Sequence, residues 1–590
     1  MPLLIYLNWL FRLIKINKFT FSKRTISLYL FLFFLVFGLQ GFAQKTWDAG
    51  GDGTSWSSAG NWNPNGVPAA GETVTISNNG SRTINVDGNY TCSSLTINYT
   101  GNTNGTISIN IIGANSLTTG AISLSNSATN GGSDINLNVA DGNIICSNIS
   151  FTQSSHDASD NFVTINTGNL NCTGNISMGA SNLRNYLLFT GAGTLNIGGT
   201  ITGGTITSSA GGGAFWPTSG TVNYNNAGAQ NIGAYTYYNL TTSGSGVKTM
   251  AGNVTVNNIL TINNNTTFAD AGFTLSSAGT LNLNSGGTLK LGAATATTWP
   301  AFSTNNIASG STVEYAANAA QVISVVPGYH HLTFSGTGVK TPPAGTLTIG
   351  GNWTVAGGNS ALNTNNTSAT VTGNIAGTGN IVTGSGTITL SGDFSNSGTF
   401  TCNTGTVTYA GTNQQVKATT YNNLTFSGGG NKTLAGAVIV NTGLTLNSGL
   451  VLLGNNNITL GQSAIVGGTP SVTAMVVTNS TGKFVKTFAA DNTPAFTFPI
   501  GEITGTTEYS PFTIDFSSTS GAAGGTVGVL VTDATHGSNA PATNYISRYW
   551  SLTTTGLANY IYTTSLTYLP ADINGSESSM SLNVRNAGAW

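Results

Sequence analysis

Acidic residues, which carry most hydrolytic and metal chemistry, are rare in this chain and unevenly placed. No Asp or Glu lies between Asp160 and Asp270, and only Asp393 lies between Glu314 and Asp491. Glycoside hydrolysis normally needs two carboxylates about 5 to 10 Å apart. The long middle of the chain cannot supply such a pair, so we expect no catalytic residues, no cofactor and no enzymatic activity.

The end regions contain a few candidate residues. Asp48 and Asp52 stand among glycines and could bind calcium through side chains and carbonyls, although their spacing matches no EF-hand or nonapeptide motif. His156, Asp157 and Asp160 could form an acid/base or metal cluster, but a polar loop of this kind is more often a solvated turn. Metal binding therefore stays open, with Asp48 and Asp52 as candidates.

Three lysines, Lys248, Lys340 and Lys432, occupy equivalent places in three similar segments. A row of ammonium groups on one face could bind an anionic glycan. The simpler interpretation, which we favour, is that each is a corner lysine that keeps a strand edge soluble. His330 and His331 stand where the other segments have Tyr-Asn and Asn-Asn, which indicates a variable corner rather than a ligand pair.

The similar segments run over residues 221–252, 312–345 and 406–436, about ninety residues apart. Between and around them, apolar residues alternate with Thr, Ser and Asn in short runs separated by Gly and Asn, as in strands with one buried face. Repeats of this kind stack into a rod with a continuous core. The sequence predicts a parallel β-solenoid over residues 101–465, with these core residues: Val222, Leu240, Leu275, Leu332, Leu390, Leu424, Leu446 and Leu460. A string of β-sandwiches is the alternative.

Composition narrows the possible partners. Only 6% of the 590 residues are charged, the net charge is -1, and 79 residues are Gly. Too few Lys and Arg are present to make a basic surface, so we expect no nucleic-acid partner. The Thr-x-Thr pairs are irregularly spaced along the chain, which argues against an ice-binding face.

The N-terminus is typical of an export signal. Basic residues such as Arg12 and Lys23 precede an apolar run over residues 28–37, and Gly41-Phe42-Ala43 offers the small residues of a cleavage site. The run is shorter than the roughly 20 residues of a membrane span. We therefore expect a signal peptide over residues 1–43, a secreted or outer-surface location, and no stable membrane span after cleavage.

Four cysteines, Cys92, Cys146, Cys172 and Cys402, lie in strand-like contexts and form no C-x-x-C pair. Such residues are expected to be small buried hydrophobes. Cys146 and Cys172 could meet if they lie one coil apart. An oxidising compartment permits a disulfide there without requiring it.

Residues 44–100 are expected to cap the solenoid, because Trp47, Trp56 and Trp62 could cover the open end of its core. The run over residues 47–56, with Asn61-Trp62-Asn63-Pro64 and Val67-Pro68, resembles the opening of large repetitive surface proteins of Bacteroidetes and of autotransporter-like β-helix proteins. The three internal repeats are similar to those of the same surface proteins.

Near residue 470 the sequence changes, and longer alternating stretches such as 512–516 and 527–531 predict an antiparallel β-sandwich-like domain over residues 471–590. Phe498-Pro499-Ile500-Gly501, Tyr509-Ser510-Pro511 and Arg548-Tyr549-Trp550 resemble the segment that follows solenoids in Bacteroidetes proteins exported by the type IX route. Because Trp590 follows an expected strand over residues 581–585, we expect this domain to be incomplete and to continue into a C-terminal sorting domain.

Two functions fit these observations. The first is a non-catalytic, adhesin-like surface protein whose stiff solenoid stalk contacts an extracellular glycan, a matrix or a neighbouring cell. The alternative is a glycan-binding or carbohydrate-active protein whose catalytic part lies outside this chain.

Overall fold

The structure is a computed structural model that describes residues 43–586, except 102–103, 129–131, 154–158, 181–183, 209–216, 358–360, 364–365, 491–492, 517–523 and 540–542. It is nearly all β, with 51% strand and 2% helix, and forms a parallel β-solenoid of about 18 turns. The expected fold class is therefore confirmed for the solenoid. Contacts divide the chain into two compact units, residues 1–187 with 203–205, and residues 188–202 with 206–590.

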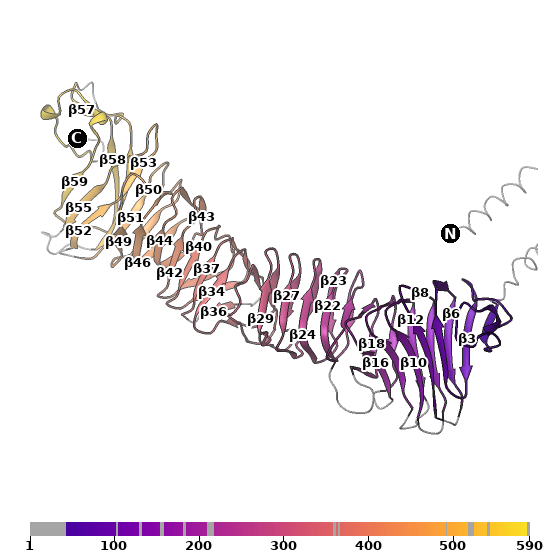
Figure 1. Ribbon diagram of the computed structural model, residues 1–590. Coiled ribbons are helices and arrows are strands. Elements are labelled where there is room, and N and C mark those ends of the chain that lie inside the picture. The colour runs from indigo at the N-terminus through magenta and orange to yellow at the C-terminus, as the bar shows by residue number, and fades with distance from the viewer. Residues whose placement is uncertain are drawn as a thin grey trace, which may run out of the picture. The chain divides into compact units, whose positions relative to one another are not determined.

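In the first unit, successive strands fall in turn on three sheets, so that each coil contributes one strand to each sheet (Figure 1). Apart from the antiparallel β1–β2 pair, neighbouring strands are parallel and in register, as between β7 and β10. The first sheet holds β1 Gln44–Trp47, β2 Trp62–Asn63, β3 Thr73–Asn78, β6 Ser94–Tyr99, β9 Ala121–Asn126, β12 Asn148–Gln153 and β15 Ile176–Ser177. The second holds β4 Arg82–Val86, β7 Gly105–Ile111, β10 Ser133–Val139 and β13 Asn161–Ile165. The third holds β5 Tyr90–Thr91, β8 Ser116–Thr118, β11 Asn143–Cys146 and β14 Asn169–Cys172.

Three tryptophans pack together at the start of this unit. Trp47 and Trp56 each meet Trp62 edge-on, with ring centroids 4.8 Å apart, and all three are buried. Trp47 ends β1, Trp62 begins β2 directly after the short 3-10 helix η1 Ala59–Asn61, and Trp56 lies in the loop before that helix. Strand β1 stacks in parallel on β3. Regular coils begin at Thr73, inside the span 44–100 that the sequence assigns to the cap.

Four short strands lie at or near the boundary of the units: β16 Asn185–Phe189, β17 Thr194–Ile197, β18 Ile201–Thr202 and β19 Thr205–Thr207. In the second unit, one sheet holds β17 with β20 Thr221–Tyr224, β22 Thr236–Thr242, β24 Val254–Ile262, β26 Leu275–Ser277, β27 Thr280–Leu283 and β29 Thr304–Ile307. The next holds β21 Gln230–Ile232, β23 Gly246–Met250, β25 Thr266–Ala269, β28 Thr288–Leu291, β30 Thr312–Tyr315, β32 His331–Phe334, β35 Trp353–Val355 and β38 Ile375–Gly377. A five-stranded sheet follows, with β31 Gln321–Val322, β33 Lys340–Thr341, β36 Ala361–Asn363, β39 Asn380–Thr383 and β41 Phe400–Cys402.

Two further sheets carry the later coils. The one called here the long sheet holds β34 Thr346–Ile349, β37 Ser368–Val371, β40 Thr387–Leu390, β42 Thr406–Tyr409, β44 Thr420–Phe426, β46 Val438–Leu446, β48 Ile458–Leu460, β49 Ile465–Gly468, β51 Phe484–Phe488, β56 Gly525–Thr532 and β58 Tyr549–Thr555. Its partner sheet holds β43 Gln414–Val416, β45 Asn431–Leu434, β47 Gly449–Leu452, β50 Ala474–Val477, β53 Ile500–Glu502 and β54 Glu508–Tyr509.

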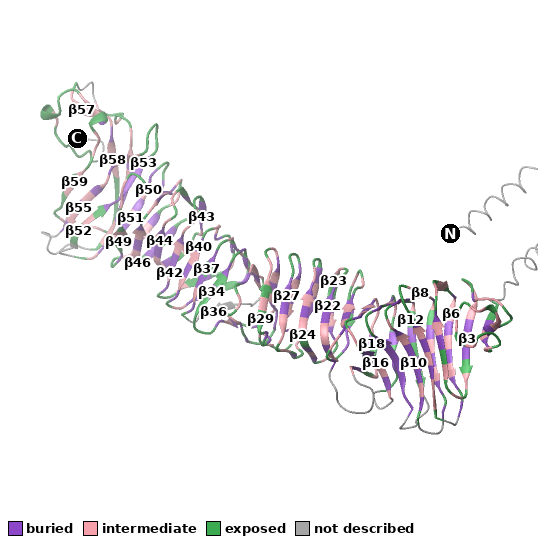
Figure 2. Ribbon diagram, in the orientation of Figure 1, coloured by how far each residue is buried: buried purple, intermediate pink, exposed green. Residues whose placement is uncertain are grey.

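Buried and less buried residues alternate along these strands (Figure 2), so that every second side chain faces the core. Each inward residue stacks on its equivalent one coil away; Val222, Leu240, Leu260 and Leu281 form one such column. All eight predicted core residues are buried, the most exposed being Leu275 at 7%. The pairings given for residues 120–465 are parallel, which confirms the predicted solenoid over this span and excludes the sandwich alternative for it.

The C-terminal segment joins the solenoid without a break in its sheets. Parallel pairing continues past residue 470, since β50 pairs with β47, β51 with β48, and β53 with β50. Antiparallel pairing then begins between β51 and β56, and β56 pairs with β58. The predicted strands 512–516 and 527–531 are present as β55 Phe512–Phe516 and within β56.

Smaller elements complete this end. Strands β52 Thr493–Phe498 and β59 Thr563–Leu566 flank β55, and β57 Tyr545–Ile546 pairs with β60 Ile573–Asn574. Two 3-10 helices, η2 Pro570–Asp572 and η3 Glu577–Ser579, lie in the same region. The expectation of a strand over residues 581–585 is wrong. Leu582 and Val584 are 68% and 64% exposed, and without a neighbouring strand to pair with, the alternating pattern forms no ladder. The predicted leader, apart from Ala43, and Trp590 lie outside the described residues.

Candidate functional site

Asp48 and Asp52, the metal candidates of the sequence, use carboxylate oxygens to fold their own loop. Asp52 Oδ1 accepts hydrogen bonds from the amides of Ser55 at 2.8 Å and Thr54 at 2.9 Å, and from Asn61 Nδ2 at 2.8 Å. The Ser55 and Thr54 amides hold the pKa of Asp52 well below its usual range. Asp48 Oδ1 accepts from the amide of Gly50 at 3.0 Å. These contacts account for both carboxylates as turn-forming groups, and metal binding by them stays a prediction.

The second candidate group is only partly described. His156 and Asp157 lie outside the described residues. Asp160 forms an ion pair with Arg184, in which Arg184 Nη2 lies 3.0 Å from Asp160 Oδ2. Burial raises the pKa of Asp160, and the Arg184 guanidinium opposes that shift. His330 and His331, expected to be a corner, bond to Ser309 Oγ and to the Asn352 amide respectively.

The repeated lysines are not surface groups, so both interpretations of them are wrong. Lys248, Lys340 and Lys432 are each 0% exposed. Lys340 Nζ donates to the carbonyls of Ala317 and Gly338, both at 2.8 Å. The lysine falls at an inward position of a short strand, where the corner carbonyls of the chain would otherwise lack donors, and an ammonium supplies three.

Each buried lysine stacks on a buried glutamine in the coil before it. The register pairs are Gln230 with Lys248, Gln321 with Lys340, and Gln414 with Lys432. Each glutamine side chain spans a corner, accepting from a backbone amide and donating to carbonyls of the preceding coil. Burial lowers the pKa of Lys340 and of Lys432 to about 8.

A tyrosine pair completes each of these repeats. The hydroxyls of Tyr409 and Tyr421 lie 2.8 Å apart; Tyr409 also accepts from the Lys417 amide, and Tyr421 donates to the Lys417 carbonyl. Tyr224 with Tyr237, and Tyr315 with Tyr329, repeat this arrangement. We call the four residues that recur in each repeat, one lysine, one glutamine and two paired tyrosines, a brace. The lysine, the glutamine and both tyrosines are therefore shared by all three segments and serve the interior of the coils.

Threonines form a column on the outward face of the long sheet. Strand register places six of them one above another: Thr348, Thr370, Thr389, Thr408, Thr425 and Thr445. None of the six hydroxyls has a hydrogen bond to another described residue. The irregular spacing noted in the sequence reflects corners of unequal length, and the strands bring the threonines back into register.

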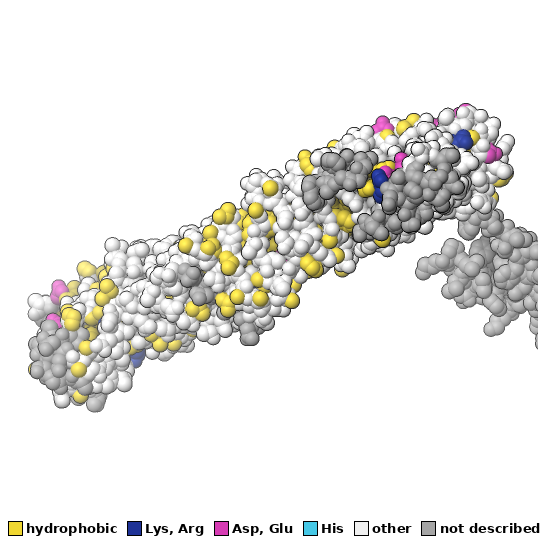
Figure 3. Space-filling model, turned by 90° about the horizontal axis from the view of Figure 1, so that it is seen from below, with side chains coloured by type: hydrophobic (Ala, Val, Ile, Leu, Met, Phe, Trp, Pro, Cys, Tyr) yellow, Lys and Arg dark blue, Asp and Glu magenta, His cyan; other side chains and the backbone are white. Residues whose placement is uncertain are grey.

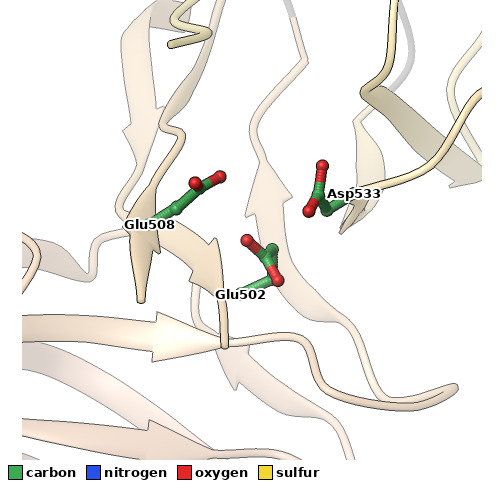
Figure 4. Close-up of side chains that lie close together, drawn as sticks. All are labelled: Glu502, Glu508 and Asp533. Carbon is green, nitrogen blue, oxygen red and sulfur yellow. The ribbon is translucent and has the colours of Figure 1, made fainter. Parts of the chain in front are cut away.

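One cluster of ionisable side chains stands out in the described part of the chain. Carboxylate oxygens of Glu502, Glu508 and Asp533 lie within 4.8 Å of one another (Figure 4). Glu502 in β53 and Glu508 in β54 are opposite each other in an antiparallel pair, and Asp533 directly follows β56. Like charges placed opposite on paired strands destabilise them.

Arg548 lies beside this cluster with a side chain that is 0% exposed. Its Nε and Nη2 contact the two carboxylate oxygens of Asp572 at 2.8 and 3.2 Å, a bidentate pair. Nη2 also contacts Glu508, and Arg548 lies 3.4 Å from Asp533 and 3.5 Å from Glu502. One guanidinium thus faces four carboxylates, which leaves a formal charge of about minus three.

Repulsion within the cluster is substantial. At an effective dielectric constant near 20, two unit charges at this separation repel by roughly 3 kcal/mol. Burial raises the pKa of Glu502. Three carboxylates at this spacing could hold a divalent cation or share protons. Sequence reasoning missed the cluster because its members are spread over residues 502–572, although the quoted motifs adjoin Glu502 and Glu508 and include Arg548.

Charged groups are few on the surface seen in Figure 3, where uncharged atoms cover most of the face. Within the described residues, no helix has the length and apolar character needed to cross a membrane.

The fold defines the chain as a parallel β-solenoid protein of about 18 turns. No family model matches it, and the searches of curated proteins and of solved structures return no match.

Proposed function

We propose that this chain is a non-catalytic, exported scaffold protein whose solenoid acts as a stiff stalk at the cell surface. The observation that carries the proposal is the repeated brace, since its lysine, glutamine and two tyrosines are present in all three segments and form buried hydrogen bonds between coils. Fully satisfied buried polar networks rigidify a fold.

Export, and kinship with Bacteroidetes surface proteins of the type IX route, are finer parts of the same proposal. They are supported by the basic and apolar N-terminus and by the motifs at residues 47–68 and 498–550. The partner would be an extracellular glycan, a matrix or a neighbouring cell. The alternative, a glycan-binding or carbohydrate-active protein with its catalytic part outside this chain, shares the export signal.

The test combines location and activity. Protease treatment of intact cells of the source organism should release fragments of the chain, and purified residues 44–590 should not turn over common polysaccharides. Retention of the chain inside the cell would contradict the scaffold proposal. Turnover that is lost on Asp393→Asn would contradict it as well, because that carboxylate lies within the solenoid.

A second candidate function is binding to ice, favoured by the threonine column. Stacked strands repeat about every 4.8 Å, so the column presents hydroxyl and methyl groups at a constant interval that is close to a repeat of the ice lattice. Regular spacing removes the objection drawn from the sequence.

Ice binding would appear as thermal hysteresis of the purified protein, lost in Thr389→Tyr and kept in Thr333→Tyr, which alters an outward position on another sheet. Absence of hysteresis in the unmodified protein would exclude this function.

A further inference from the structure

The acidic cluster carries an inference that goes beyond the scaffold. Asp572 neutralises Arg548 through a bidentate pair, so Glu502, Glu508 and Asp533 are left with three negative charges and only the remaining contacts of one guanidinium. A folded protein seldom leaves such a group uncompensated, because bringing like charges together opposes folding.

A second observation comes from Glu502 itself. This residue is 2% exposed, and its Oε1 is buried without a hydrogen-bond partner, while Oε2 accepts from the Thr504 amide. Oε1 forms an ion pair with Arg548 Nη1 at 3.5 Å, a distance too long for a hydrogen bond. A buried carboxylate oxygen without a hydrogen bond destabilises the fold when it is ionised, and Figure 4 shows that Glu502 points toward Glu508 and Asp533.

The geometry also fits a particular ion. Two ligands of one calcium ion can lie at most about 4.8 Å apart, which is twice a calcium–oxygen distance of roughly 2.4 Å, and the three ligand oxygens satisfy this limit. Calcium takes 6–8 oxygen ligands, often including waters. Asp533 has a side chain that is 27% exposed, so one side of the cluster can admit water.

We propose that Glu502, Glu508 and Asp533 form a calcium site at the C-terminal end of the solenoid. Glu502 and Glu508 belong to the partner sheet, whereas Asp533 follows β56 of the long sheet. A bound calcium ion therefore links the ends of two sheets and offsets the repulsion between the carboxylates. The Arg548 guanidinium, held by its ion pair with Asp572, contacts Glu508 and lies within 3.5 Å of Glu502 and Asp533, so this guanidinium and the calcium ion share the three carboxylates.

The experiment is a calorimetric titration of EDTA-treated residues 44–590 with calcium chloride at pH 7.5, together with thermal melts at increasing calcium. We expect one ion to bind with a dissociation constant on the order of 10⁻⁴ to 10⁻³ M, as in extracellular modules, and melting of the C-terminal strands to shift upward with calcium concentration. Magnesium should bind at least tenfold more weakly.

Asp533→Asn and Glu508→Gln should each weaken calcium binding at least tenfold. Glu314→Gln, which removes a carboxylate paired with Lys290 in the solenoid, should leave binding unchanged and serves as the matched control. Absence of calcium binding in the unmodified protein, or equal binding by Asp533→Asn, would overturn the site. If both cluster variants fail to fold, the titration of the unmodified protein and its magnesium comparison still decide the proposal.

Discussion

Replacing Lys340 by methionine should weaken the coils around it far more than the same replacement at a surface lysine. Methionine keeps much of the buried aliphatic stem but removes the ammonium that donates to Ala317 O and Gly338 O. Each buried carbonyl left without a donor costs about 1–3 kcal/mol. Part of this cost is offset because methionine, unlike lysine, buries no charge. We therefore expect a net loss of about 3 kcal/mol.

Because solenoid coils interact mainly with their neighbours, the loss should be local. Hydrogen exchange followed by mass spectrometry measures local opening directly, and about 3 kcal/mol corresponds to roughly 100-fold faster exchange in peptides covering residues 311–350. Lys290→Met is the matched control, since Lys290 forms a partly exposed ion pair with Glu314, with side chains 38% and 19% exposed, and ion pairs near the surface are worth about 0–1 kcal/mol. Equal exchange in the two variants would refute the brace.

Three further predictions follow from the interior of the coils. Leu424→Ala, at a position 0% exposed, should cost about 2–5 kcal/mol in the free energy of unfolding, measured by urea denaturation; a loss below 1 kcal/mol would contradict the stacked core. Tyr421→Phe removes the hydroxyl that joins Tyr409 to the Lys417 carbonyl and should cost about 1–3 kcal/mol, whereas no change would show that the pair adds nothing. Burial lowers the pKa of Lys340, Lys432 and Lys486 to about 8. From about pH 8 to 9.5 these lysines therefore bind more protons in the unfolded chain than in the folded protein, so they make the free energy of unfolding rise with pH. The rise in the free energy of unfolding should be smaller in Lys340→Met than in the unmodified protein. An equal rise in the two proteins would contradict the lowered pKa of Lys340.

Much of the fold could be predicted from the sequence because the physical signal is local and repeated. Alternation such as Thr406-Val407-Thr408-Tyr409 specifies one buried and one exposed face, and the recurrence of the pattern predicts stacking. Register between coils depends on corner lengths, and these vary. The sequence therefore revealed the strands but not the threonine column.

The interior polar groups and the acidic cluster could not be predicted for a different reason. Lysine is almost never fully buried, so a lysine in a strand-like run is assigned to the surface unless its carbonyl partners are known. The cluster joins side chains from β53, β54 and the segment after β56, and its register comes from antiparallel pairing that follows the parallel coils. Only the fold brings these carboxylates together.

The stiffness of the scaffold can be measured most directly by the distance between two spin labels on the threonine column. Labels at Thr348→Cys and Thr445→Cys, with Cys402→Ser to remove the one partly exposed thiol among the four cysteines, are separated by five strand steps. At about 4.8 Å per step, the backbone positions lie roughly 24 Å apart. We predict a single narrow distribution of distances near this value in double electron–electron resonance, whereas a broad or multi-peaked distribution would contradict a stiff stalk.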